Sequence, residues 1–173
     1  KDLHLVASKR SAGNKMSCGD EEFVIQDIEN FNFSNIDIAF FSAGAKTAEK
    51  YAPLAVSSGC TVIDNSSYFR THEDKLLIVP EVNSKDLCNF ESPGIISNPN
   101  CSTAQLVIAL KPLHDLYTIK RIIVSTYQSV SGGGKAPMDE LIEQTKLALD
   151  GKEIKPKNFT KQIAFNAIPH IDM

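Results

Sequence analysis

The sequence lacks the features expected of a membrane-embedded or nucleic-acid-binding protein. No apolar run approaches the ~18 residues that a membrane-spanning helix needs, and residues 1–10 have no long apolar core of the signal-peptide kind. Positive charge is also limited, because 18 Lys and Arg stand against 21 Asp and Glu, for a formal net charge of -3. We therefore expect no nucleic-acid and no membrane partner, and a cytoplasmic location.

The cysteines lack the spacing of a metal site or a disulfide framework. Cys18, Cys60, Cys88 and Cys101 form no CxxC pair, so we expect no bound metal and, in a reducing compartment, free thiols. A free cysteine is most often a buried apolar residue. We expect that of Cys18, Cys60 and Cys88, whereas the surroundings of Cys101 differ.

Short apolar runs alternate with turns and a helical pattern in the first part of the chain. The runs at residues 36–41 and 60–64 have the apolar character of buried parallel strands. Residues 46–58 between them predict a helix that Gly59 ends, although Pro53 predicts a kink or break. This order predicts an α/β fold with a parallel sheet. Four further short strands are predicted, at residues 3–7, 22–26, 76–79 and 94–97.

The alternation of short strands and helices ends after residue 98. A turn at residues 98–100 leads into a predicted helix over residues 101–110, which should end near Pro112. The β-rich run at residues 120–130 predicts a long strand of a mixed or antiparallel sheet. Three glycines, Gly132–Gly134, follow this run and break it. A second helix, which is amphipathic, is predicted over residues 138–149.

These elements predict two domains with a boundary near residue 98. The first part has the strand–helix order of a parallel α/β fold. In the second part, long strands with polar positions suit a mixed or antiparallel sheet.

The clearest chemical signal surrounds Cys101. Pro99 disfavours a helical conformation at Asn98, so a helix should begin at or just after Asn100 and carry Cys101 in its first turn. Unpaired amides and the positive end of the helix dipole favour a thiolate there. Since the thiolate is the reactive form, Cys101 is a candidate nucleophile, and a buried structural cysteine is the alternative.

Segments along the whole chain resemble aspartate-semialdehyde dehydrogenases. The family's active-site signature is matched by SNPNCST at residues 97–103. Asn100 and Ser102 argue against the related N-acetylglutamyl-phosphate reductases, whose cysteine usually lies in a Pro-Gly-Cys-Tyr context. Further matches occur in the family's order: FFSAG at 40–44, VIDNSSYFR at 62–70, VPEVN at 79–83, ALKPLHDLY at 109–117, VSTYQSVSGGGK at 124–135 and QIAFNAIPHID at 162–172.

The resemblance implies NADPH-dependent reduction of aspartyl 4-phosphate to aspartate 4-semialdehyde in lysine or diaminopimelate, methionine and threonine synthesis. It implies that Cys101 forms a thioester and that Gln128 orients the acyl group. Arg70 and Asn100 would hold the phosphate region, and the family is typically a homodimer or tetramer. The alternatives are an N-acetylglutamyl-phosphate reductase-like enzyme, a thiol hydrolase without nucleotide, and a non-catalytic dinucleotide-binding module.

A basic, hydroxyl-rich turn follows the first predicted strand. It contains no carboxylate, which would select NAD, whereas basic and hydroxyl groups accommodate the 2′-phosphate of NADP. The alternative for this turn is a solvated surface turn. For Ser42 the alternative is an ordinary strand–helix turn, and for the glycine triplet Gly132–Gly134 it is a flexible hinge. The cofactor contacts that the resemblance implies are Ser8, Arg10, Ser11, Ser42, Gly44, Ser131 and Gly132.

Two parts of the family's pattern are not found in this sequence. No GxGxxG-like turn precedes Leu3, and the family's acid–base histidine and carboxylate-binding arginine follow the segment that ends at residue 172. The resemblance therefore implies a chain that lacks both ends of the family's sequence and does not complete the catalytic cycle alone. It assigns residues 1–98 to a partial Rossmann-type, NADP-binding domain and residues 99–173 to part of an α+β catalytic and dimerisation domain, both incomplete. His170 matches a different position of the family and is not expected to be the base.

Overall fold

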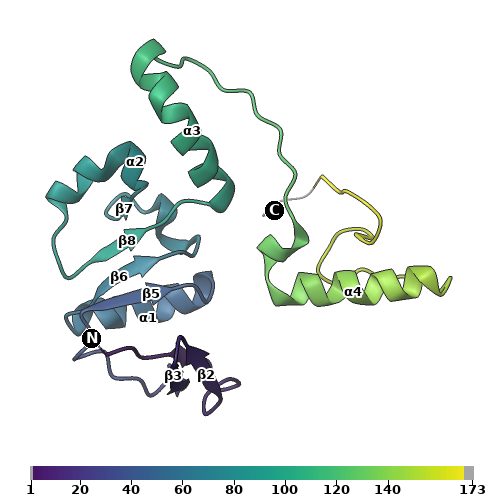
Figure 1. Cartoon of the computed structure of the whole chain (residues 1–173), viewed down its shortest axis with the longest axis horizontal. Helices are drawn as coiled ribbons and strands as arrows, with labels where there is room; N and C mark the ends of the chain where they lie inside the picture. Colours follow the sequence, from purple (N-terminus) through teal and green to yellow (C-terminus); the bar gives the residue numbers. More distant parts are fainter. Residues whose placement is uncertain (1, 170–173) are drawn as a thin grey trace. The chain divides into compact units, whose positions relative to one another are not determined.

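The computed structural model describes residues 2–169, which form two compact units (Figure 1). The first unit ends at Lys120 and the second begins at Arg121. Within the described residues, no helix combines the length and apolarity needed to cross a membrane. The functional boundary near residue 98 stays a prediction.

A four-stranded parallel sheet with the order β5-β6-β8-β7 lies at the centre of the first unit (Figure 1). Each strand was predicted from the sequence with slightly wider bounds, and the α/β class is confirmed. Since all four strands are parallel, their carboxyl ends lie along one edge of the sheet. The strands are β5 (Ile38–Phe41), β6 (Thr61–Asp64), β7 (Leu76–Leu77) and β8 (Ile95–Ser97).

Helix α1 (Ala45–Ser57) connects β5 to β6 and packs against the sheet. Its buried face consists largely of alanines, which allow the helix to approach the strands closely. The helix continues through Pro53, so the predicted break there is wrong. Pro53 lies on the exposed face, where water can bond the carbonyl that loses its partner, while the opposite face stays packed. Gly59 follows the helix with φ 96°, a conformation that glycine adopts without strain.

The start of the chain forms two small sheets. Strand β1 (Val6–Ala7) pairs in parallel with β4 (Gln26–Asp27). Strands β2 (Lys15–Cys18) and β3 (Glu21–Val24) form an antiparallel hairpin that is largely exposed. The sequence predicted one strand at 22–26, whereas the structure divides that run between β3 and β4. It did not predict β2, which is only 4 residues long and exposed throughout.

Three short helical segments lie in the connections that follow β6 and β7. They are the 3₁₀ turn η1 (Tyr68–Thr71), the short helix α2 (Pro80–Asn83) and the 3₁₀ segment η2 (Ser84–Asn89).

Helix α3 (Cys101–Tyr117) closes the first unit and contacts α2. The predicted end near Pro112 is wrong, because the helix continues for more than a turn beyond it. Lys111 and Asp115 form an ion pair with Nζ 2.6 Å from the carboxylate across that turn, and Pro112 is exposed. Thr118 then ends the helix with φ 55°.

The second unit is built on α4 (Lys135–Leu149), preceded by the 3₁₀ turn η3 (Val130–Gly133). Residues 120–129 run without a strand partner among the described residues, so the predicted strand is not formed. A strand requires a neighbouring backbone, and none of residues 121–169 supplies one. Ile123 and Tyr127 on this segment are 83% and 95% exposed.

Candidate active site

The loops that follow β5, β6 and β8 begin side by side. Phe41, Asp64 and Ser97 lie in one row of the sheet, since Asp64 is in register with both Phe41 and Ser97. Asp64 and Ser97 are fully buried. The residues next along the chain in each strand therefore leave the sheet at the same edge, as is usual for ligand sites in parallel α/β folds.

The turn after β8 is attached to β6 and caps α3. The Asn98 amide donates to the Asp64 carbonyl oxygen at 2.8 Å. Asn100 is the N-cap of α3, and its Oδ1 accepts a hydrogen bond from the Ser102 amide at 2.9 Å. The helix begins at Cys101, so the predicted helix start is confirmed. The Cys101 residue is exposed at this position.

Arg70 bridges two loops at this edge. Its Nε donates to the Asn98 carbonyl oxygen at 2.8 Å, and its Nη2 donates to the Asn65 carbonyl oxygen at 3.0 Å. Arg70 is half-buried and lies on η1, next to the core residue Phe69. The guanidinium group is therefore attached to the turn that carries Cys101.

A buried carboxylate shapes the loop after β6. Asp64 accepts hydrogen bonds from the Ser66 amide at 2.9 Å and the Ser66 hydroxyl at 2.8 Å. The Ser66 hydroxyl oxygen in turn accepts a bond from the Tyr68 amide at 3.2 Å. This chain of contacts fixes the start of η1, and hence the position from which Arg70 extends.

The other cysteines occupy different surroundings. Cys60 is fully buried in the core, and burial, together with the nearby Asp37 carboxylate, raises the pKa of its thiol. Cys18 and Cys88 are exposed, so the prediction that they are buried is wrong. Cys18 lies on the exposed β2–β3 hairpin and Cys88 on η2, which has no buried residue. Cys101 is thus distinguished by its place at a helix start.

The turn predicted to bind the adenosine phosphate follows β1. The Ser11 and Ala12 amides donate to the Ser8 carbonyl oxygen at 2.8 and 3.1 Å, which closes the turn. Arg10 is exposed at its tip, and within residues 2–169 its side chain makes no hydrogen bond or ion pair. The turn fits an external phosphate group.

Ser42 and Gly44 lie between β5 and α1. Gly44 is the N-cap of α1 with φ 88°, and a Cβ added to it would meet nothing within 4 Å. No side chain caps this helix, and its first turn has no acidic residue. Its first amides are thus open to an anion, and the turn fits a pyrophosphate.

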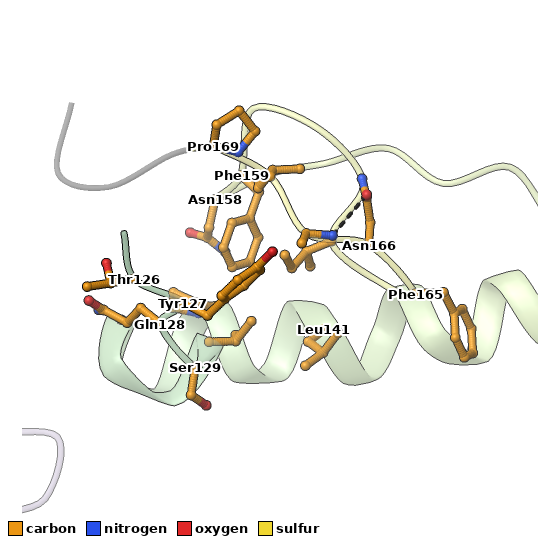
Figure 2. Close-up of a pocket in the computed structure, with 16 residues that line it drawn as sticks. Thr126, Tyr127, Gln128, Ser129, Leu141, Asn158, Phe159, Phe165, Asn166 and Pro169 are labelled. Atoms are coloured by element: carbon orange, nitrogen blue, oxygen red, sulfur yellow. Dashed lines mark hydrogen bonds between the residues drawn. The ribbon is translucent and has the colours of Figure 1, made fainter. Parts of the chain in front are cut away.

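The second unit contains a pocket of about 1040 Å³ (Figure 2). Gln128 and Ser129 line it from the segment before η3, and Leu141 lines it from α4. Asn158 and Phe159 line it from the loop after α4. The pocket thus joins apolar side chains to residues with side-chain amides.

Gln128 lies close to the glycine triplet. A Cβ built on Gly132 would come within 2.7 Å of Gln128 Nε2 and 3.3 Å of Gln128 Cδ. Ser129 caps η3, and its hydroxyl lies 2.9 Å from the Ser131 hydroxyl. The predicted residues Gln128, Ser131 and Gly132 are therefore neighbours in this unit.

A buried carboxylate and an amide attach the loop after α4 to that helix. Glu140 is 4% exposed and accepts bonds from the Lys157 and Asn158 amides at 2.8 and 2.6 Å. It also accepts from Asn158 Nδ2 and Gln144 Nε2. Gln144 is 2% exposed, and its Oε1 accepts from the amides of Ile163 and Ala164.

This network affects the ionisation of Glu140. Burial by itself raises the pKa of the carboxyl, but the amides of Lys157 and Asn158 and the side chains of Asn158 and Gln144 together lower it below its ordinary value. Sequence reasoning missed both Glu140 and Gln144. Their spacing of four residues is equally typical of a solvated helix face, so the sequence contains no signal of their burial.

The structure brings the predicted catalytic and substrate-binding residues together in two groups. Arg70, Asn100 and Cys101 lie at the carboxyl edge of the first unit, and Gln128 lies with the glycine triplet in the second. No group of three or more potential metal ligands occurs among residues 2–169. His170 lies outside the described residues.

The comparisons with known proteins agree on one family. Residues 1–90 match "Semialdehyde dehydrogenase, NAD binding domain", and residues 110–173 match "Semialdehyde dehydrogenase, dimerisation domain". The chain is 50% identical over 170 residues to an aspartate-semialdehyde dehydrogenase of Shewanella sp. (strain DB6705), which covers 98% of this chain and 50% of that protein. The chain thus spans about half the length of the curated relatives it matches.

Solved structures show the same similarity. One is the crystal structure of aspartate semialdehyde dehydrogenase II complexed with ASA from Vibrio cholerae, with a TM-score of 0.94 and 47% identity over 100% of this chain and 52% of that one. Another is the crystal structure of aspartate semialdehyde dehydrogenase with NADP from Candida albicans, with a TM-score of 0.57 and 29% identity over 68% of this chain and 40% of that one.

Proposed function

This chain belongs to the semialdehyde dehydrogenase family, and from that premise we propose that the protein containing it reduces aspartyl 4-phosphate to aspartate 4-semialdehyde with NADPH and releases phosphate. One observation carries the proposal. An exposed Cys101 begins α3, directly after a capping Asn100 and a turn that is attached to Arg70. Such a constellation suits covalent catalysis on an acyl phosphate.

Cys101 is the nucleophile in this proposal. Its Sγ attacks the acyl carbon as a thiolate, a carbon–sulfur bond forms, and the bond from that carbon to the phosphate oxygen breaks. Cys101 is exposed at the start of α3, so its Sγ is accessible to an acyl phosphate. The acyl group is then held as a thioester, which divides one difficult displacement into two easier steps.

Arg70 and Asn100 hold the leaving phosphate. A guanidinium group has five N–H donors, and Arg70 gives one from Nε and one from Nη2 to backbone carbonyls. The remaining donors can bind phosphate oxygens. Since Asn100 Oδ1 accepts from Ser102, its Nδ2 group is the side that can donate to the substrate.

Gln128 orients the acyl group. Gln128 lines the pocket of the second unit, and a side-chain amide can donate to a developing oxyanion. The close approach of Gly132 restricts the space open to this amide. Glu140 supports the same pocket by holding Asn158, which also lines it.

NADP fits the turns after β1 and β5. Arg10 and Ser11 would bind the 2′-phosphate, with Ser8 closing their turn. Ser42 and Gly44 would hold the pyrophosphate at the start of α1, and Ser131 and Gly132 the nicotinamide side. When bound, the nicotinamide supplies the hydride that converts the thioester to the aldehyde and releases the Cys101 thiolate.

The proposal extends to assembly and location. The match of residues 110–173 to a family dimerisation domain supports a homodimer or a larger homo-oligomer. A cytoplasmic location follows from the proposed biosynthetic role. The expectation that this chain alone does not complete the cycle stays a prediction, because its test requires the complete protein.

The test is oxidation of aspartate semialdehyde by NADP in the presence of phosphate, with the complete protein. We expect turnover that requires phosphate and that Cys101→Ser abolishes, whereas Cys18→Ser and Cys88→Ser retain it because both thiols lie outside the site. Full activity of Cys101→Ser would exclude the thioester route. Preference for N-acetylglutamate semialdehyde would assign the protein to the other branch.

A further inference from the structure

We propose that Arg70 is a positioning residue for Cys101, because it fixes the turn from which α3 and its first residue begin. This inference rests on the proposed function, in which Cys101 is the nucleophile. It gives Arg70 a role before any substrate binds, in addition to contact with phosphate.

The geometry of the Arg70 side chain supports this role. Nε bonds the Asn98 carbonyl oxygen at 2.8 Å and Nη2 bonds the Asn65 carbonyl oxygen at 3.0 Å. The two carbonyls belong to the loops that follow β8 and β6. A planar guanidinium group holds both at a fixed separation, which an ammonium group on a flexible stem does not reproduce.

Asn98 is held on both sides. Its amide donates to the carbonyl oxygen of Asp64, at the end of β6, and its own carbonyl accepts from Arg70. The half-buried Asn98 therefore takes its position from β6 and η1, as well as from the strand that precedes it. Without Arg70, the Asn98 carbonyl loses its charged donor.

The position of Asn98 is passed on to Cys101 through a short, stiff connection. Pro99 has a restricted φ, so little rotation is available between Asn98 and Asn100. Asn100 then sets the start of α3 through its bond to the Ser102 amide. A shift at Asn98 therefore moves the N-cap and the amides around Cys101.

Arg70 itself extends from a firm base. Phe69 beside it is 4% exposed and belongs to the hydrophobic core. The start of η1 is fixed by the buried contacts of Asp64 with Ser66 and of Ser66 with Tyr68. The core of the first unit thus determines where the guanidinium lies, and through it where α3 begins.

The test measures Cys101 in the complete protein without substrate or cofactor. Iodoacetamide alkylation is followed residue by residue by mass spectrometry across a pH series. Exposed Cys18 and Cys88 serve as internal references, and buried Cys60 reports any loss of the fold. Phosphate contact alone gives Arg70 no effect in this assay, because no phosphate is present.

The variants are Arg70→Ala, Arg70→Lys and, as a control, Lys75→Ala. Lys75 is also partly buried and lies just after η1, but its ion pair is with Asp74. We expect both Arg70 variants to slow Cys101 alkylation near neutral pH by about 2- to 5-fold, the size of the effect of a helix N-terminus on an exposed anion. The rates of Cys18 and Cys88, and all rates in Lys75→Ala, should not change.

Two results would overturn the inference. An unchanged Cys101 pH profile in both Arg70 variants would leave Arg70 as a phosphate ligand alone. A normal profile in Arg70→Lys with a slow one in Arg70→Ala would show that charge, and not the two carbonyl contacts, is what matters. If Arg70→Ala disrupts the fold, so that Cys60 becomes reactive, the result for Arg70→Lys alone tests the inference. Failure of the proposed function looks different, since wild-type Cys101 would then react no faster than Cys18.

Discussion

The side-chain amide of Gln128 lies so close to Gly132 that a methyl group there would come within 2.7 Å of Gln128 Nε2. The φ of Gly132 is not in the left-handed region, so backbone conformation is not what requires glycine here. The space above Gly132 is occupied by the amide that we propose to orient the acyl group.

Gly132→Ala should therefore displace the Gln128 amide with little loss of stability, because a long side chain can rotate away. We expect a lower kcat and an almost unchanged Tm in the complete protein. A double-mutant cycle with Gln128→Ala provides the control. If Gly132 acts through Gln128, the double variant should be no slower than Gln128→Ala alone, and additive losses would point to a direct contact of Gly132 with the cofactor.

Glu140→Gln should destabilise the protein. The amide would place a donor where Glu140 now accepts from Lys157, Asn158 and Gln144, at a cost of about 1–3 kcal/mol for an unsatisfied buried group. Glu143→Gln is the matched control on the same helix. Among residues 2–169 the exposed Glu143 bonds only Lys157 Nζ, a surface pair worth roughly 0.2–1 kcal/mol. Equal losses in urea unfolding would contradict the prediction.

The lowered pKa of Glu140 also predicts that its contribution to the free energy of unfolding depends on pH. Because the pKa of Glu140 is lower in the folded protein than its ordinary value of 4.5, ionised Glu140 stabilises the fold above that pH. This contribution is lost as the pH falls below 4.5 and through the lowered folded value. The difference in unfolding free energy between wild type and Glu140→Gln should thus shrink in acid, and a constant difference from pH 7 to pH 3 would refute this.

Asn100 combines two roles that substitutions can separate. Asn100→Ala removes the N-cap of α3 and should cost about 0.5–2 kcal/mol of stability. Asn100→Asp keeps an acceptor for the Ser102 amide but loses the Nδ2 donor and adds negative charge. We expect it to retain the wild-type Tm while raising the KM for phosphate. A normal KM in this variant would show that Asn100 only caps the helix.

Arg10→Ala should weaken the binding of NADPH far more than that of NADH. Arg10 is exposed on a closed turn without a partner among residues 2–169, as a ligand for an external phosphate should be. Hydrogen bonds to charged groups contribute about 1.5–3 kcal/mol, so we expect a loss of roughly 10- to 100-fold for NADPH by fluorescence titration. Equal losses for both cofactors would refute the assignment.

Local sequence signals predicted the parts of this structure that depend on neighbouring residues. Pro99 and Asn100 act on the residues beside them, so the start of α3 at Cys101 could be predicted. The parallel strands could be predicted because they are short apolar runs bounded by turns.

Features that depend on distant residues could not be predicted. Whether residues 120–130 form a strand depends on a partner backbone, which no local pattern supplies. The burial of Glu140 depends on a loop 17 and 18 residues away along the chain. Exposure of Cys88 likewise follows from the packing of η2 and not from the residue type.

The hydrogen bonds of Glu140 and Gln144 also indicate where residues can be inserted into the second unit. They attach residues 157–158 and 163–164 to α4, whereas residues 153–156 lie between the end of the helix and the first attachment point. Those four residues make no hydrogen bond to α4 among the contacts described, and most of them are exposed. An insertion there leaves both attachment points in register, so this segment is the natural place to add a peptide tag or a fluorescent label.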